Sequence, residues 1–405
     1  MQVFTIACLI TFLWLCFGYS LAFSPALPAP YAKSSAIYGN ASRFWMRGLH
    51  VNSYHQLATS IPESVYCMYQ LTFAIITPAL ICGSFADRMK FVPMLIFTTL
   101  WHFLVYCPIA HACWHPEGLL LQRGMLDYGG GNVVHIASGV SGLVAAVILG
   151  PRKGFGREVF EPHNVMFSMV GVCLLWVGWF GFNAGSATSA GTRAGMAMLV
   201  THISASVGGL SWLATEWFLT GVPKLTAIGN GVIAGLVTIT PASGYVDPNG
   251  AFFFGLFAGP LCLAGAKIKH YLGYDDALDA FGVHAVGGLL GGFLTGLFAT
   301  DQVIPGYSGL FYTNVVDGGN QLLVQVYSCL FCLGWAAIVS FIILKAIDLT
   351  LGLRVNDDEE FCGLDSSYHG ESLDDSVSSR GPTKIVVKSS AKVHDESVQE
   401  RLVEP

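Results

Sequence analysis

The chain has 405 residues, of which 53% are hydrophobic and only 11% are charged. Because a soluble domain carries about 25% charged residues, this composition excludes an ordinary soluble protein and predicts a polytopic membrane protein. Residues 1–349 carry 14 basic and 14 acidic residues, whereas residues 350–405 carry 6 basic and 12 acidic ones, so the net charge of −6 lies near the C-terminus. No basic cluster indicates a nucleic acid partner.

Ten apolar stretches predict an all-α membrane protein with about ten transmembrane helices. A helix needs about 20 apolar residues to cross a bilayer, and fewer where it is packed deep within a bundle. The stretches cover residues 1–23, 65–85, 92–113, 131–150, 164–186, 195–217, 225–241, 251–267, 281–299 and 322–348. A cleaved signal peptide is the alternative for the first stretch. We expect a retained helix, because no basic residue precedes the apolar run, which is longer than the apolar core of a usual signal peptide.

Lysine and arginine residues gather in alternate breaks between these stretches, and this asymmetry predicts the orientation. One set of breaks holds Arg88, Lys90, Arg152, Lys153, Arg157, Lys224, Lys267, Lys269, Lys345 and Arg354. The other short breaks hold only Arg123 and Arg193. By the positive-inside rule the first set is cytoplasmic, and so are both termini of this chain. The triplet that begins at Asn40 then lies outside, where it is a candidate for N-glycosylation.

Two segments repeat one pattern, in which an acidic residue precedes a histidine by eight positions inside a glycine-rich apolar run. Asp127 precedes His135, and Asp276 precedes His284. Eight helical residues rise about 12 Å, so each histidine lies well inside a hydrocarbon core about 30 Å thick. The predicted orientation brings the two in from opposite faces. We therefore expect them to meet near the midplane, between two inverted five-helix halves that surround a central pore.

The alternative for each histidine alone is a hydrogen bond to a neighbouring helix, but ionisable groups at this depth are costly and usually mark a pathway. Their matched positions favour the pore. A neutral imidazole offers one hydrogen-bond donor and one acceptor. That suits a small polar molecule and not a bare metal ion, whose lost hydration would go uncompensated. The sequence has no phosphate loop, nucleophile triad or metal-ligand cluster, so neither an enzyme nor a cofactor is expected.

Several motifs resemble the ammonium transporter/methylammonium permease/Rhesus family, and its ammonium transporter branch most closely. They are DYGGGNVVHIASGVSGL, CPIAHACW, GWFGFNAGSA, ITPASGY, DDALDAFGVHAVGG and LGLRV…GLDSSYHGES, and they occur in the family's order. The match covers nearly all of residues 1–372. The family pattern has eleven helices and residues 1–23 resemble the second, so the resemblance implies that the first transmembrane helix is absent from this sequence.

The resemblance implies a homotrimer in the lipid bilayer that transports ammonium, with methylammonium as an analogue, through one pore per subunit. The implied site residues are Trp114, Ser186 and Phe73 for recruitment, Phe73 and Phe182 for a gate, His135 and His284 for the pore, and Asp127 and Asp276 for electrostatic or structural support. The cation would lie against aromatic faces, worth ~0.5–2 kcal/mol, and donate to the serine hydroxyl. It would then lose a proton and pass onward as ammonia. Potassium cannot shed its charge, so selectivity is a test of protonation.

Three alternatives to the transporter stay open: an ammonium sensor, a Rhesus-type neutral-gas channel, and an inert truncated subunit of a mixed trimer. We expect a transmembrane transporter domain over 1–349, a family-type cytoplasmic segment over 350–372 and a disordered polar tail over 373–405. The resemblance implies the plasma membrane of a eukaryote as the location, with the C-terminal tail in the cytoplasm.

Overall fold

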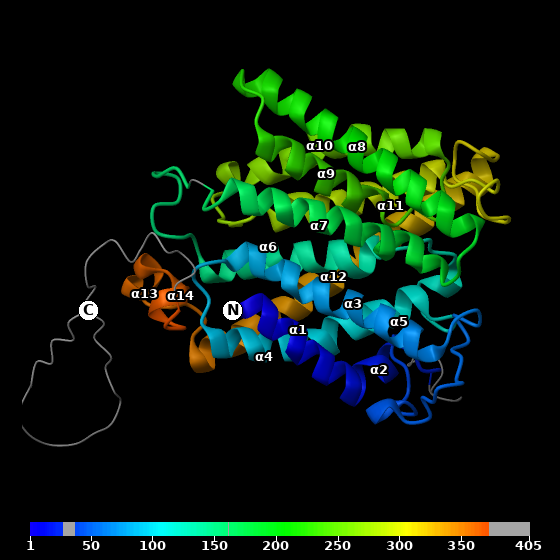
Figure 1. Cartoon of the computed structure of the whole chain (residues 1–405), viewed down its shortest axis with the longest axis horizontal. Helices are drawn as coiled ribbons and strands as arrows, with labels where there is room; N and C mark the ends of the chain where they lie inside the picture. Colours follow the sequence, from blue (N-terminus) through cyan, green and yellow to red (C-terminus); the bar gives the residue numbers. More distant parts are fainter. Residues whose placement is uncertain (27–36, 161, 372–405) are drawn as a thin grey trace, which may run out of the picture.

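The computed structural model describes residues 1–26, 37–160 and 162–371, and over these residues it is a bundle of helices without strands. The predicted tail at 373–405 lies outside the described residues. The helices run roughly along one direction (Figure 1). The described residues therefore have the all-α fold that the apolar stretches predict.

The helices in the first part of the chain are often continued by π-helical or 3-10 segments. They are α1 (Gln2–Leu13), η1 (Trp14–Gly18), α2 (Tyr19–Phe23), η2 (Phe44–Met46), α3 (Glu63–Ile81), η3 (Cys82–Phe85), α4 (Phe91–Trp101), η4 (His102–Tyr106), α5 (Cys107–Trp114), η5 (Leu121–Arg123), η6 (Gly131–Ile136) and α6 (Ala137–Leu149). The segment predicted as a retained helix, Gln2–Phe23, is one continuous apolar helix that packs against α3 and α4.

The second part of the chain contains longer helices and ends in two short ones. They are α7 (Val165–Ala184), η7 (Gly185–Ala187), α8 (Thr192–Thr220), α9 (Leu225–Ile239), α10 (Pro248–Leu272), η8 (Phe281–Ala285), α11 (Val286–Phe298), α12 (Val315–Leu351), α13 (Asp357–Cys362) and α14 (Leu364–Ser367). Capping fixes several of their boundaries. At the start of α10, for example, Asp247 accepts a hydrogen bond from Gly250 N at 2.8 Å and Pro248 occupies the first turn.

Within the described residues, nine helices are long and apolar enough to cross a membrane. The tenth predicted span, 225–241, is α9, which is apolar but has only 15 residues. It ends at Ile239, two residues before Pro241, which has no backbone N–H to continue the helical hydrogen bonds. Helices α8 and α10 cover it. The approach to α8 is so close that a Cβ on Gly235 would overlap the Ser204 carbonyl oxygen.

Two groups of helices form the bundle, one of α7–α11 and one of α1–α6 with α12 (Figure 1). In the second group, Trp101 is fully buried and its indole N–H contacts the hydroxyls of Ser141 at 2.9 Å and Ser340 at 3.1 Å, which joins α4, α6 and α12. The groups meet where η6 and α6 contact η8 and α11. There a Cβ on Gly139 would overlap the Ala285 backbone nitrogen, and one on Gly288 would lie 2.9 Å from Gly131 O. Glycine at these positions allows the two histidine-bearing segments to touch.

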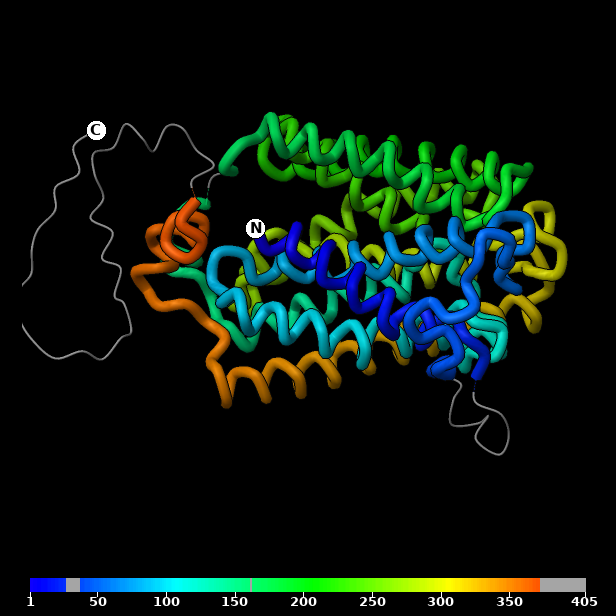
Figure 2. The backbone as a smooth tube through the Cα atoms, turned by 60° about the horizontal axis from the view of Figure 1, so that its bottom comes forward, coloured from blue at the N-terminus to red at the C-terminus, as the bar shows by residue number. Residues whose placement is uncertain are grey.

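We call the end of the bundle that holds Met1, the turn at 86–90 and α13–α14 the tail end, and the opposite end, with residues 37–60 and 115–130, the far end. Figures 1 and 2 show that α1 begins and α12 stops at the tail end, as the predicted common side of both termini requires. The chain after α12 docks there on the 86–90 turn. Lys90 N donates to Leu353 O at 2.9 Å, and Val355 N donates to Arg88 O at 3.1 Å.

Candidate functional site

Asp127, in the turn before η6, serves as a helix cap at the far end. Its carboxylate accepts hydrogen bonds from the backbone N–H groups of Gly130, Gly131, Asn132 and Val133 at 2.6–3.3 Å. Burial raises the pKa of Asp127, although these four donors oppose the shift. The carboxylate is only 5% exposed, so it orders the start of the histidine helix and does not face an incoming ligand directly.

Three predicted aromatic residues come together at the far end, from α3, α5 and α7. The rings of Phe73 and Phe182 lie 4.2 Å apart, inclined by 30°, and the ring of Trp114 meets Phe73 edge-on at 5.4 Å. The indole N–H of Trp114 donates to Asp127 O at 2.8 Å, which fixes the plane of its ring. Phe73 is 1% exposed, so its ring is enclosed by these neighbours.

Ser186 lies beside this aromatic group, at the end of α7, and is held by Tyr69 of α3. The Tyr69 hydroxyl contacts Ser186 Oγ at 2.6 Å and donates to Phe182 O at 2.7 Å. The ring of Tyr69 also meets Phe73 edge-on at 4.9 Å. The far-end group therefore contains a serine hydroxyl, a tyrosine hydroxyl and aromatic faces within one contact network, which suits a small cation with N–H donors.

His135 and His284 meet in the middle of the bundle, as the repeat predicts. Their Nδ1 atoms lie 3.2 Å apart, with ring centroids at 5.3 Å and ring planes within 18°. Two neutral imidazoles can make this contact only if one ring donates from Nδ1 and the other accepts there. His135 is 1% exposed, and its Nε2 has no hydrogen-bond partner in the part of the chain that the structure describes.

An unbroken row of rings joins the far-end group to the histidine pair. Phe182 lies 6.1 Å from His135, measured between ring centroids, and Trp179 stacks on His135 at 5.4 Å with planes within 14°. Trp179 precedes Phe182 by three residues on α7, so both rings lie on one helix face. The Trp179 indole N–H is bonded to Thr240 Oγ1 at 2.9 Å, which holds the ring in place.

Asp276 repeats the capping role of Asp127 in the second half. Its Oδ2 accepts from Phe281 N, the first residue of η8, at 2.7 Å. Its Oδ1 is buried and has no partner among the described residues. Lys269 donates to the Asp276 carbonyl at 2.8 Å and to the Asp279 carboxylate at 2.6 Å, so its charge is paired with Asp279. Each histidine helix thus begins at an aspartate cap.

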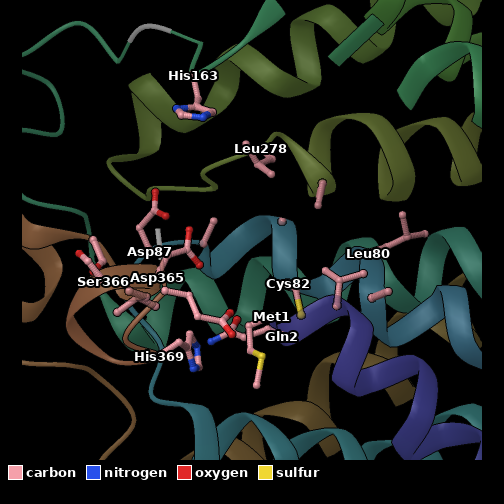
Figure 3. Close-up of a pocket in the computed structure, with 18 of the residues that line it drawn as sticks. Met1, Gln2, Leu80, Cys82, Asp87, His163, Leu278, Asp365, Ser366 and His369 are labelled. Carbon is pink, nitrogen blue, oxygen red and sulfur yellow. The ribbon is translucent and has the colours of Figure 1, made fainter. Parts of the chain in front are cut away.

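A cavity of about 930 Å³ lies at the tail end (Figure 3), and His284 is among the residues that line it. We call it the exit cavity. Its wall includes His284, Leu80 of α3, Leu278 of the loop before η8, and residues 362–366 of the docked tail. His284 is 8% exposed. The ring row and the exit cavity therefore approach the same two imidazoles from opposite ends.

The structure groups Phe73, Trp114, Phe182 and Ser186 at the far end and brings His135 against His284, with Asp127 and Asp276 at the starts of the two histidine helices, whereas Asn40 lies apart from all of them. Asn40 lies in the far-end loop, where its side chain accepts a hydrogen bond from Ser42 N at 2.9 Å. The described residues contain no group of three or more His, Cys, Asp or Glu side chains placed to hold a metal ion.

Two residues of the site, Tyr69 and Trp179, were missed in the sequence analysis. Both lie one helical turn from a predicted site residue. Tyr69 precedes Phe73 by four positions, and Trp179 precedes Phe182 by three in GWFGFNAGSA. Helical spacing from a recognised site residue was the signal that could have found them.

Comparisons with known proteins agree with this geometry. The family model described as the Ammonium Transporter Family matches residues 1–373. The chain is similar to the ammonium transporter of Bacillus subtilis (strain 168), with 41% identity over 373 residues that cover 92% of this chain and 88% of the relative. The crystal structure of Saccharomyces cerevisiae Mep2 matches with a TM-score of 0.80 at 34% identity, covering 88% of this chain and 79% of that one. A structure named "Sensor Amt Protein" matches with a TM-score of 0.79 at 25% identity, covering 90% and 88%.

Proposed function

The chain belongs to the ammonium transporter family, and from that premise we propose that it carries ammonium across a membrane by a deprotonation mechanism. It is a multi-pass membrane protein of that family, with nine membrane-length helices among the described residues. The observation that carries the proposed mechanism is the His135–His284 pair, 3.2 Å apart, at the end of an unbroken row of rings.

The cation is recruited at the far end. Ammonium lies against the faces of Trp114 and Phe73, where a cation gains ~0.5–2 kcal/mol from an aromatic ring, and donates an N–H to Ser186 Oγ. The contacts of Ser186 Oγ with the Tyr69 hydroxyl and with Phe182 O support this role because they orient the serine hydroxyl. Asp127, as a buried carboxylate beneath Trp114, favours positive charge at this end without touching the ligand.

Only the uncharged molecule goes further. The Phe73–Phe182 pair opens as a gate, and beyond it the environment is apolar except for the imidazoles, so a bare cation would lose its hydration without compensation. Ammonia can donate to one imidazole nitrogen and accept from another, which matches the donor–acceptor pair of His135 and His284. A potassium ion has no proton to release and is rejected at this step.

In this proposal the protein lies in the plasma membrane and its tail end faces the cytoplasm. Arg88, Arg152 and Lys269 belong to the lysine- and arginine-rich breaks that the positive-inside rule assigns to that side. Residues 1–349 act as the transporter domain and residues 350–372 as its cytoplasmic segment. Asn40, in the far-end loop, is then outside and open to glycosylation.

We propose a homotrimer, since it is implied by the resemblance. Mass measurement of the detergent-solubilised protein tests this, and a purely monomeric mass contradicts it.

The experiment that tests the function is uptake of labelled methylammonium in cells that lack their own ammonium transporters, with surface expression checked. We expect saturable uptake that unlabelled ammonium inhibits. Electrical recording in the same cells separates the alternatives, because passage of a neutral gas carries no net current. A well-expressed protein without any uptake would contradict the proposal and favour the sensor or the inert subunit.

A further inference from the structure

The wall of the exit cavity carries charge of one sign. The side chains that line it include three carboxylates, those of Asp87, Asp365 and Glu371, and neither lysine nor arginine among the described residues. All three carboxylates are on exposed residues, so they face the water of the cavity mouth and give this wall negative charge. Figure 3 shows Asp87 and Asp365 on the same side of the cavity, between His163 and His369.

Four basic residues at this end, Arg88, Lys90, Lys153 and Arg354, make contacts outside the cavity lining, and Arg152 pairs with Asp275. Arg88 is fully buried and donates to carbonyl oxygens at Ser84, Ala86, Gly150 and Asp275. Each of the other three has a partner outside the lining: Lys153 pairs with Asp357, Arg354 with Glu360, and Lys90 donates to Leu351 O. A cation that enters the cavity therefore meets three carboxylates and neither lysine nor arginine in the described wall.

The docked tail supplies two of the three carboxylates, and its own contacts keep them together. Glu371 N donates to Asp365 O at 2.8 Å, and His369 N donates to Leu364 O at 3.1 Å. The His369 ring meets Phe91 of α4 edge-on at 5.2 Å, which holds this end of the tail against the bundle. The third carboxylate, Asp87, belongs to the turn on which the tail docks.

His284 supplies the independent sign that a ligand enters this cavity. His284 is only 8% exposed, and it lines the cavity. Its Nδ1 is bonded to His135, and its Nε2 makes no hydrogen bond within the described part of the chain. A polar atom in this position needs a partner that comes from the cavity itself.

We propose that the exit cavity is a second cation-binding site, in which ammonium is held by Asp87, Asp365 and Glu371 before release. The inference rests on the proposed function, since it takes ammonia as the molecule that leaves the histidine pair. Ammonia that reaches the cavity water takes a proton from a hydronium ion, which becomes water. The ammonium ion so formed meets three carboxylates, and its return past His284 as a cation is blocked by desolvation.

The first test locates the site without any transport. Thallium(I), a monovalent cation similar in size to ammonium, is soaked into crystals of the full chain and detected by its anomalous scattering. We expect a peak in the exit cavity that is lost in the Asp87→Asn/Asp365→Asn/Glu371→Gln variant. The control is Asp358→Asn, which removes an exposed tail carboxylate outside the cavity lining. An empty cavity in the unmodified protein overturns the proposal, whatever the variant does.

The second test measures the site during transport. In proteoliposomes, ammonium on the tail side should inhibit methylammonium uptake from the far side. The ammonium concentration that halves uptake should rise by about fivefold or more in Asp365→Asn and in Glu371→Gln, and stay unchanged in Asp358→Asn. Unchanged inhibition in both cavity variants overturns the exit site. If the unmodified protein binds thallium in the cavity but carries no methylammonium, the site stands and the proposed transport function fails.

Discussion

Two neighbours orient Ser186. Its Oγ contacts the Tyr69 hydroxyl, which also donates to Phe182 O, and it lies 3.0 Å from Phe182 O itself. With Tyr69 in place, the serine hydroxyl has a fixed partner and a lone pair left for an N–H donor. Replacement of the tyrosine by phenylalanine keeps the ring against Phe73 and removes only the hydroxyl. The variant therefore isolates one atom of the far-end site.

We expect Tyr69→Phe to raise the KM for methylammonium by about three- to tenfold, since one hydrogen bond contributes about 0.5–1.5 kcal/mol, and to change the maximal rate much less. The measurement is concentration-dependent uptake at equal surface expression. Tyr271→Phe is the matched control, because Tyr271 is 87% exposed. A KM for Tyr69→Phe that matches the control would remove Tyr69 from the site.

The residues that the sequence identified were those whose chemistry is unusual for their surroundings. His135 and His284 stood out because ionisable groups inside apolar helices are rare, and the structure places them in contact. Tyr69 and Trp179 are ordinary residues for a membrane helix, and aromatic residues there mostly pack. Their roles depend on which helix faces which, and helix packing is a tertiary property that local sequence does not encode.

Among the elements, the two histidine-bearing helices cross at a glycine, where the space between them excludes a larger residue. Gly139 has no space for a side chain, because a Cβ there would overlap the Ala285 backbone nitrogen. The contact joins α6 to η8, one turn beyond His135. If this close contact between α6 and η8 is lost, the two imidazoles move out of hydrogen-bond distance.

We expect Gly139→Ala to lower the thermal unfolding temperature of the purified protein and to reduce uptake, since overpacking costs about 1–3 kcal/mol. Gly178→Ala is the matched control. It lies on α7, another membrane-length helix, and a Cβ there would meet no atom within 4 Å. Equal unfolding temperatures for the two variants would show that the crossing tolerates a methyl group and would contradict this account.

The far-end loop is the element in which we expect stability to depend on pH. His55 is buried, with Nε2–H donating to Phe23 O at 3.0 Å and Nδ1 accepting from Leu57 N at 3.2 Å. Burial lowers the pKa of His55, although the Phe23 carbonyl and Glu63 oppose the shift. The neutral form is thus favoured in the folded loop. Its stabilisation is complete above the unfolded pKa of about 6.5 and is lost as the pH falls below it.

Hydrogen exchange measures this directly. After correction for intrinsic rates, amides near residues 50–60 should exchange faster at about pH 5.5 than at about pH 7.5. The change should disappear in His55→Gln and persist in His50→Gln, which alters an exposed histidine of the same loop. Loop protection that is independent of pH in the unmodified protein would contradict the role of His55.

Element positions followed from hydropathy with few exceptions, and the family resemblance read from the motifs is confirmed by the match over residues 1–373. Apolar length located the nine membrane-length helices, and deep packing explains the short α9. The π-helical segments, such as η6 and η8 at the two histidines, were not predicted. Their i→i+5 hydrogen bonds are not specified by any residue type, so the sequence carried no signal for them.

For the whole molecule, an ion pair at the tail end braces one helix group against the other. Arg152, after α6, donates to the carboxylate of Asp275, before η8, at 2.7 Å and 2.9 Å. Burial alone would raise the pKa of Asp275, but the hydrogen bonds and charge of Arg152, together with Arg88, lower it. The carboxylate therefore stabilises the fold at neutral pH, and this contribution is lost as the pH falls through its lowered pKa.

We expect Asp275→Asn to destabilise the protein by about 3 kcal/mol, because it removes the counter-charge of Arg152, whose side chain is 12% exposed, and of the fully buried Arg88. Thermal unfolding in detergent at neutral pH is the measurement. Asp348→Asn breaks the exposed pair with Lys345, whose side chains are 36% and 44% exposed, and should have little effect. If the two variants unfold at the same temperature, the brace does not hold the helix groups together.

The central claim for the molecule is that substrate passes between the two helix groups at the His135–His284 pair. The most direct measurement is labelled methylammonium uptake by the His135→Ala/His284→Ala variant, in cells lacking their own ammonium transporters and at surface expression matched to the unmodified protein. The account predicts saturable uptake by the unmodified protein and none above background by the variant. Uptake that survives the loss of both imidazoles would contradict it and place the pathway elsewhere in the bundle.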